Sequence, residues 1–445
     1  MSTISIDLNL TKKQSETFKI LLDQVHTEIL YGGAKGSGKS YLGCVWVVYM
    51  CLTYPGIRAL IGRTVLTQLR VTTIKSLLEL LKNCNIKPDE HYTYNQQSNE
   101  LKFFNGSEIV FRDLSFNPSD PNYDSLGGLE ITIAFIDEVA QVSRTAYDVV
   151  RSLLRYKIKE YNLTPKLFMS CNPSQSWLKQ EFYLPYINGT IEDNKIFIQA
   201  LPTDNKHLPQ SYLDILKSLP PKQMKRLYLG DWNYEQQEDS LFDFDLISES
   251  IFKNTPNIQD KKYISVDVAR FGNDRSVAIV WSGLVVLEIF VYSKLSTTEL
   301  TSEIKELIAK YGVHPSNIIV DSDGVGGGVA DQIRGTNFVN NSKALHDQNF
   351  SNLKSQCYVK LADLFKEGKI SLNIMDPNKI DELTQELLSV RLKDVDKDTK
   401  VTVASKDEMK KILGKSPDLS DALMMGMYFQ IKNLKATGRY AIAFI

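Results

Sequence analysis

The sequence has no long apolar stretch and few cysteines. None of its apolar runs approaches the roughly 20 residues of a membrane-spanning helix, so we do not expect a membrane protein. The first residues have neither a basic flank nor an apolar core, and a secretory signal peptide is not expected. The five cysteines are odd in number and lack metal-site spacing, which favours a reducing, cytosolic compartment over a disulfide framework.

The chain also lacks an excess of charge of either sign. Its 52 Lys and Arg residues against 53 Asp and Glu residues give a formal net charge of −1. This value neither indicates nor excludes a polyanionic partner, because nucleic-acid binding needs a local basic surface rather than a basic total. With 445 residues, 43% of them hydrophobic and 24% charged, the sequence is typical of an ordinary soluble protein with two domains.

The most informative stretch is the glycine-rich segment 33–40, GAKGSGKS, which satisfies the pattern G-x-x-x-x-G-K-[ST]. A strand-like segment precedes it and an apolar, helix-compatible segment follows it, an order that places backbone N–H groups around a polyphosphate. We expect Lys39 to reach the β- and γ-phosphates of ATP and the Ser40 hydroxyl to bind Mg²⁺. The alternative is a glycine turn that matches by chance. The residues expected to hold the nucleotide are Gly33, Lys35, Gly36, Ser37, Gly38, Lys39 and Ser40.

An acidic pair later in the chain predicts the second half of this site. Residues 131–136 are apolar and largely β-branched, as in a strand buried on both faces, and Asp137 and Glu138 follow them. At the carboxyl edge of a parallel sheet both side chains would emerge beside the phosphate loop. We expect Asp137 to complete the Mg²⁺ site that Ser40 begins, and Glu138 to orient or deprotonate the attacking water. The alternative is an acidic pair that merely ends a strand.

Four other polar residues are compatible with the same site. Gln14 lies on a polar helix before the loop, where its amide can pair with an adenine edge, although a solvated helix residue is the commoner interpretation. Arg63 follows a strand and would contact phosphate or make a surface ion pair. Ser170 and Asn172 end another strand, where they would sense the γ-phosphate; a plain strand followed by a proline turn is the alternative.

The second half of the chain predicts an RNase H-like fold. Residues 262–292 favour a meander of three strands, and a helix over 297–311, a buried strand over 317–321 and a late helix from Pro417 follow. Acids end the first strand and the buried strand, and two more lie three residues apart on one face of the late helix. Such acids can hold two Mg²⁺ ions about 4 Å apart for phosphodiester cleavage. The alternative is that each acid only ends a strand or caps a helix. The acids are Asp267, Asp321, Asp418 and Asp421.

These parts, in this order, resemble the large subunit of tailed-bacteriophage terminases over nearly the whole chain. In the N-terminal half the resemblance rests on a glutamine before the phosphate loop, a basic residue within it (Lys35), the Asp-Glu pair and the segment from Ser170 to Asn172. In the C-terminal half it rests on the acids that end two strands and on the segment 416–423, SPDLSDAL.

The resemblance also implies roles for the acids. It implies that Asp267, Asp321 and Asp421 bind metal, that Asp418 supports them, and that Asp274 and Asp323 orient metal-bound water. Beside these acids, four lysines suggest either a local basic surface that neutralises DNA phosphates or a solvated helix face. They are Lys406, Lys410, Lys411 and Lys415.

The function implied by the resemblance is viral DNA packaging. The predicted fold class is α/β, with an N-terminal ASCE-type P-loop ATPase domain on a mostly parallel sheet and a C-terminal RNase H-like nuclease domain. We expect an ATPase core over 1–175, a lid and linker over 176–240 and the nuclease domain over 241–445. ATP hydrolysis would drive double-stranded DNA into a procapsid, and the nuclease, with Mg²⁺ or Mn²⁺, would cut concatemeric DNA.

The resemblance further implies partners and a location. The partners would be the portal protein, a small terminase subunit and further copies of the chain in a ring, a pentamer, on the procapsid. The location would be the host cytoplasm and, transiently, the portal vertex, without a place in the mature virion. Two alternatives remain: a P-loop helicase-nuclease of DNA repair, against which the lack of a second set of helicase motifs counts, and a non-enzymatic ATP-gated DNA clamp.

Overall fold

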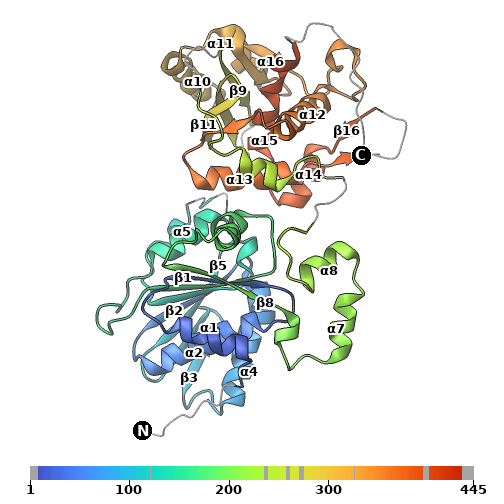
Figure 1. The fold of residues 1–445 in the computed structure, drawn as a ribbon. Helices are drawn as coiled ribbons and strands as arrows, with labels where there is room; N and C mark the ends of the chain where they lie inside the picture. The colour runs from blue at the N-terminus through green and yellow to red at the C-terminus, as the bar shows by residue number, and fades with distance from the viewer. Residues whose placement is uncertain are drawn as a thin grey trace. The chain divides into compact units, whose positions relative to one another are not determined.

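The computed structural model describes residues 9–117, 119–120, 122–234, 239–256, 261–269, 275–324, 326–393 and 400–432 (Figure 1). The chain divides into two compact units, Met1–Glu235 and Gln236–Ile445. The finer division into a core, a lid and a nuclease domain stays a prediction. Among the described residues, no helix has the length and apolar character needed to cross a membrane.

The first unit is built on an 8-stranded sheet with the order β3-β4-β5-β2-β6-β7-β1-β8. From β5 to β8 in this order all neighbouring strands are parallel, and only β3, β4 and β5 pair antiparallel. Because β7 separates β1 from β6, the sheet has the arrangement expected of an ASCE-type ATPase. The strands are β1 Glu28–Gly33, β2 Arg58–Arg63, β3 Tyr92–Asn95, β4 Glu100–Phe103, β5 Glu108–Asp113, β6 Ile133–Ile136, β7 Lys166–Cys171 and β8 Lys195–Ala200.

Helices cover both faces of this sheet, because successive residues of a strand point to opposite faces. Ile29 and Tyr31 of β1 pack in one core with α1 (Lys12–Leu21), α2 (Lys39–Thr53) and α4 (Lys75–Asn83), whereas Leu30 packs in a second core with α5 (Arg144–Ser152) (Figure 1). The remaining elements of the unit are α3 Leu66–Leu69, η1 Arg70–Ile74, η2 Asp124–Leu126, η3 Val139–Gln141, η4 Lys179–Tyr183, α6 Leu184–Ile187, η5 Pro202–Asp204, α7 Gln210–Lys217 and α8 Pro221–Leu227.

The second unit contains a 6-stranded sheet with the order β13-β12-β9-β10-β11-β14. Strands β9, β10 and β11 form an antiparallel meander, and β12 joins β9 in parallel on its other side. This order is that of an RNase H-like fold, so the predicted α/β fold class is confirmed. The strands of this sheet are β9 Lys262–Asp267, β10 Ser276–Ser282, β11 Val285–Tyr292, β12 Ile318–Asp321, β13 Thr336–Phe338 and β14 Ser371–Leu372.

Helices complete the second unit, together with a small antiparallel pair of strands, β15 (Leu392–Lys393) and β16 (Thr402–Val403). The helices are α9 Phe244–Glu249, α10 Thr297–Tyr311, η6 Pro315–Asn317, α11 Gly326–Ile333, η7 Leu345–Asp347, α12 Leu353–Lys366, α13 Pro377–Ser389, α14 Lys406–Leu413, α15 Asp418–Met425 and α16 Met427–Lys432.

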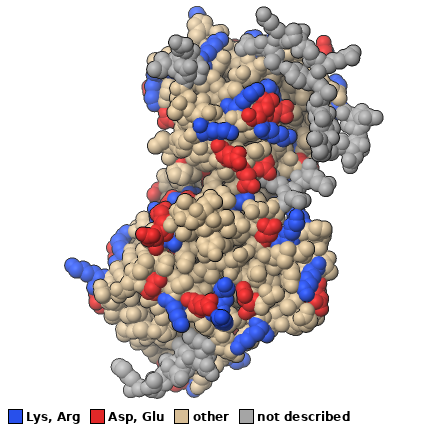
Figure 2. Space-filling view, in the orientation of Figure 1, with Lys and Arg blue, Asp and Glu red and all other residues tan. Residues whose placement is uncertain are grey.

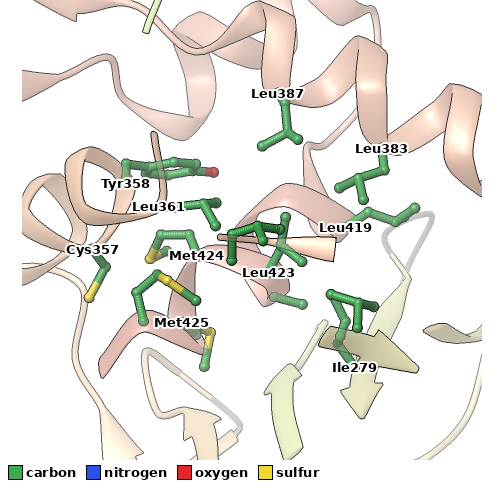
Figure 3. Close-up of a cluster of buried hydrophobic side chains, with 14 of the residues drawn as sticks. Ile279, Cys357, Tyr358, Leu361, Leu383, Leu387, Leu419, Leu423, Met424 and Met425 are labelled. Carbon is green, nitrogen blue, oxygen red and sulfur yellow. The ribbon is translucent and has the colours of Figure 1, made fainter. Parts of the chain in front are cut away.

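Helix α15 lies at the centre of the second unit. All of its residues are buried, and its apolar side chains lie among those of α12, α13 and β10 (Figure 3). Leu423, for example, is fully buried close to Leu383 and Leu387. Because the whole helix is buried, the acidic residues of its first turn also lie in the interior of the unit.

We expect Leu423→Ala to lower the free energy of unfolding by about 2–5 kcal/mol, because the change removes buried methyl groups and leaves a cavity. The measurement is calorimetric unfolding of the full-length chain. Met375→Ala is the matched control, since that side chain is 84% exposed. Equal unfolding temperatures for the two variants would contradict the packing described here.

Candidate functional sites

The glycine-rich loop encloses the side chain of Lys39. Gly36 (φ 84°) and Gly38 (φ 79°) adopt left-handed backbone conformations that glycine tolerates best, and α2 begins directly after them. Lys39 Nζ donates hydrogen bonds to the carbonyl oxygens of Ala34 (2.6 Å) and Gly33 (3.3 Å). It also donates to Ser37 Oγ (3.2 Å) and to Asn172 Oδ1 (3.2 Å). Burial lowers the pKa of Lys39, and the nearby carboxylates oppose this effect.

Two other predicted loop residues have evident local reasons for their identity. A Cβ atom on Gly33 would come within 1.9 Å of the Ala200 carbonyl oxygen. Only glycine therefore allows β8 to pack this closely against β1 at this position. The buried Ser37 donates from Oγ to the Ala34 carbonyl oxygen at 3.0 Å. Lys35 presents its side chain to solvent, while its backbone N–H bonds the Leu227 carbonyl oxygen at 2.9 Å.

Asp137 and Ser40 meet, as expected for a Mg²⁺ site. Ser40 Oγ donates to Asp137 Oδ1 at 2.9 Å, and Ser170 Oγ donates to the same oxygen at 2.5 Å. Thr73 Oγ1 donates to Asp137 Oδ2 at 2.5 Å from the π-helical turn η1, a kind of element often found at functional sites. Hydroxyl and carboxylate oxygens are the ligands that Mg²⁺ prefers, so Ser40 and Asp137 fit this ion. Sequence analysis missed Thr73, because nothing in its neighbourhood distinguishes it from other polar helix residues.

Glu138 occupies a strained position directly after β6. Its backbone lies in the left-handed region (φ 54°, ψ 47°), which is costly for a residue with a side chain and recurs at active sites. Its N–H donates to Ser170 Oγ at 3.4 Å. Burial, and then the neighbouring Asp137, raises the pKa of Glu138, while Lys39 opposes the rise. A raised pKa makes this carboxylate a better proton acceptor near neutral pH.

Gln14 reaches the phosphate loop, although its amide is already engaged. Gln14 Nε2 donates to the Gly38 carbonyl oxygen at 2.9 Å, and Oε1 accepts from Thr11 N at 2.9 Å in a capping box. The side chain therefore joins α1 to the loop, and its contact with adenine stays a prediction. Asn205, which sequence analysis missed, also supports the loop, through a 2.7 Å bond from Nδ2 to the Gly36 carbonyl oxygen.

In the second unit, three of the four predicted acids surround the ammonium group of Lys406. Its Nζ lies 3.2 Å from Asp267 Oδ2, 3.2 Å from Asp418 Oδ1 and 3.4 Å from Asp421 Oδ2. These carboxylates come from the end of β9 and the first turn of α15, as expected. Sequence analysis placed Lys406 beside the acids, on a basic surface or a solvated helix face, and its side chain is in fact 40% exposed. Its ammonium group nevertheless lies among the carboxylates, and although burial works against its charged form, they raise its pKa.

Carboxylate oxygens suit Mg²⁺ and Mn²⁺, so the chemistry of this cluster fits divalent metal. Among the described residues, however, no three His, Cys, Asp or Glu side chains converge closely enough to hold a single ion. The Lys406 ammonium supplies the positive charge between the carboxylates in this conformation. The predicted two-metal site therefore stays a prediction.

The acids of this cluster differ in their surroundings. Burial raises the pKa of Asp267 well above its ordinary value, and Lys406 opposes the rise. Asp421 is also buried, but the ammonium groups of Lys354 and Lys406 lower its pKa. Lys354 Nζ lies 2.8 Å from Asp421 Oδ1, and Tyr358 OH donates to the same oxygen at 2.7 Å. Sequence analysis missed Lys354 and Tyr358, which lie on α12, far from any motif.

Asp321 ends β12 and is held mainly by its neighbours. Its Oδ1 accepts from Asp323 N at 3.0 Å and from Asn340 Nδ2 at 3.3 Å. Asn340 also donates from Nδ2 to Asp323 Oδ2 at 2.9 Å, so it fixes both predicted acids. Burial raises the pKa of Asp321. Asp274 lies outside the described residues.

The predicted basic surface is less extensive than the lysine count suggests. Lys415 forms an ion pair with Glu382, which also accepts a hydrogen bond from Arg275 Nη2 at 2.6 Å. On the face shown in Figure 2, basic and acidic side chains lie intermixed among the described residues of each unit. Contacts with DNA phosphates therefore stay a prediction for Lys410 and Lys411.

Residues 24–231 match the model of the phage terminase large subunit family, which confirms the resemblance predicted from the motifs. No curated protein matches the chain. Among solved structures, the chain is similar to the large terminase of a thermophilic bacteriophage (16% identity, TM-score 0.44), with 94% of this chain and 98% of that chain covered. It is also similar to the nuclease domain of the large terminase subunit of bacterial virus Sf6 (21% identity, TM-score 0.38), with 42% of this chain and 98% of that chain covered.

Proposed function

We propose that the chain is a DNA-packaging ATPase and nuclease, because residues 24–231 match the model of the phage terminase large subunit family. The observation that carries the proposal is the hydrogen bond between Ser40 of the phosphate loop and Asp137 of the acidic pair. This bond brings together two residues 97 positions apart, both of which can offer oxygen ligands to Mg²⁺.

In the first unit, we assign a separate role in ATP hydrolysis to each residue of the site. The loop N–H groups and Lys39 would hold the phosphates, and Ser40 and Asp137 would hold Mg²⁺, which would supply positive charge to the phosphate oxygens during hydrolysis. Glu138 accepts a proton from the attacking water, a role favoured by its raised pKa and its fixed backbone. Ser170 bonds both Asp137 and the Glu138 N–H, so it can transmit changes at the phosphate to β7.

In the second unit, we propose metal-dependent cleavage of concatemeric DNA. Asp267, Asp321 and Asp421 would hold Mg²⁺ or Mn²⁺ with the support of Asp418, and the metal would activate water and stabilise the leaving oxygen. Lys354 and Tyr358 keep the Asp421 carboxylate oriented. Lys406 would exchange its contacts with the carboxylates for contacts with a DNA phosphate, because a cation and an ammonium compete for the same oxygens.

The partners follow from the family alone. We propose double-stranded DNA, the portal protein, a small terminase subunit and further copies of this chain in a pentameric ring. The chain would act in the host cytoplasm and at the portal vertex of the procapsid, and would not remain in the mature virion.

The test uses the full-length chain with Mg²⁺ or Mn²⁺. We expect ATP hydrolysis that double-stranded DNA stimulates, and cleavage of supercoiled plasmid that chelation of the metal abolishes. A strand-displacement assay distinguishes the repair helicase-nuclease, since a packaging motor moves duplex DNA without separating its strands. Nucleotide-dependent DNA binding with neither hydrolysis nor cleavage would instead support the ATP-gated clamp.

A further inference from the structure

Arg226 lies on α8 in the first unit, outside every motif found in the sequence. Its Nε donates to the Pro173 carbonyl oxygen at 2.8 Å. Asn172, the residue before Pro173, accepts a hydrogen bond from Lys39 Nζ. The residue after Arg226, Leu227, accepts at its carbonyl oxygen from Lys35 N at 2.9 Å. Arg226 is therefore held between the phosphate loop and the end of β7, where the γ-phosphate of a bound nucleotide would lie.

Within the part of the chain that the structure describes, the remaining donors of this side chain have no hydrogen-bond partner. The guanidinium carbon lies 5.5 Å from the centre of the Tyr234 ring, within the range of a cation–π contact. Among the described residues, only Nε of Arg226 makes a hydrogen bond, so its Nη groups are unused. The positive charge of Arg226 also acts on Glu138 and on Cys171, which end neighbouring strands.

Two other basic residues of the first unit fit a γ-phosphate contact less well. Lys35 is exposed. Arg63 Nη1 donates to Thr72 Oγ1 at 3.0 Å and lies 4.0 Å from Asp137 Oδ2, which places it on the metal side of the site. Arg226 is fixed by the two segments that flank the phosphate position, and its free donors match phosphate oxygens.

We propose that Arg226 contacts the γ-phosphate of ATP bound to its own chain and stabilises the charge that develops during hydrolysis. In this step the water oxygen bonds the γ-phosphorus, and the bond from phosphorus to the bridging oxygen breaks with its electrons going to ADP. Glu138 takes the water proton. The guanidinium contact exists only while the third phosphate is present, so Arg226 loses this contact when phosphate leaves. This inference rests on the proposed ATPase function.

The test compares Arg226→Ala and Arg226→Lys in the full-length chain with Lys217→Ala as the control. Lys217 carries the same charge on neighbouring α7, and it lies 3.9 Å from the Asp214 carboxylate. For Arg226→Ala we expect kcat to fall about 10³-fold, as for other arginines that contact a transferred phosphoryl group. We also expect the preference for ATPγS over ADP to disappear while ADP affinity changes less than about threefold. Arg226→Lys should recover part of kcat, because lysine restores the charge without the paired donors.

Two results would overturn the inference. One is a kcat within about threefold of wild type in Arg226→Ala, against the decrease expected for a phosphoryl contact. The other is an equal loss of ADP and ATPγS affinity together with a lower unfolding temperature, which would make Arg226 a purely structural link to Pro173. If the wild-type chain hydrolyses no ATP, the proposed function fails separately, and the ratio of ATPγS to ADP affinity still decides the role of Arg226.

Discussion

Replacing Glu138 with glutamine is expected to abolish steady-state ATP hydrolysis by the full-length chain while nucleotide binding persists. The glutamine side chain has nearly the same size and can keep the left-handed backbone at this position, but it accepts no proton. We expect kcat to fall by about 10²–10⁴-fold, the range for loss of a general base. Lys39, Ser40 and Asp137 remain in place, so affinity for Mg²⁺-ATP should change little.

The measurement pairs kcat from phosphate release with the dissociation constant of a fluorescent ATP analogue. Glu160→Gln is the matched control, since that carboxylate is 54% exposed and pairs with Lys157. A variant that keeps more than about a tenth of the wild-type kcat would show that another group accepts the proton. The raised pKa of Glu138 also predicts that wild-type activity falls on acidification at a higher pH than an ordinary glutamate would give.

Replacing Asp267 with asparagine is expected to abolish plasmid cleavage and leave ATP hydrolysis intact. Asp267 is buried at the end of β9, and its carboxylate makes one of the three contacts with Lys406. Asparagine keeps the shape but removes the charge that holds a divalent cation. A loss of about 4 kcal/mol of charge stabilisation corresponds to a decrease of about 10³-fold in cleavage rate.

Both activities are measured on the same full-length preparation, with Mg²⁺ and with Mn²⁺. Asp347→Asn is the control, because that side chain is 84% exposed in the same unit. If Asp267→Asn cuts plasmid as fast as the control, the carboxylate cluster is not the nuclease site. A simultaneous loss of ATP hydrolysis would indicate misfolding instead, and calorimetric unfolding of the variant separates these two outcomes.

The motifs were the reliable part of the sequence. The phosphate loop and the acidic pair are short, contiguous patterns. The loop requires two glycines with left-handed backbone conformations, the acidic pair requires a buried strand before it, and both features are evident from the residues. The positions of Asp267, Asp321 and Asp421 were also predictable, because strand and helix periodicity places an acid at the end of its element. These features were enough to predict the α/β fold class of both units.

The contacts of Lys406 could not be predicted from the sequence. Its neighbours on α14 predicted a basic surface beside the acids or a solvated helix face, but not that its ammonium group contacts a carboxylate 139 positions away in the chain. The same holds for four other residues, which lie in no recognisable motif and contact an acid from another part of the chain. They are Thr73, Asn340, Lys354 and Tyr358.

The sequence by itself determined which residues can do chemistry and on which ends of which elements they lie, since those properties depend on residues close together in the chain. Only the tertiary structure decided which side chains support or compete with them. Those contacts depend on how buried elements such as α15 pack against the sheet, and packing is set by the joint fit of distant segments that no single segment encodes. For Arg226 the same reason applies: its place beside the phosphate loop follows from the docking of α8.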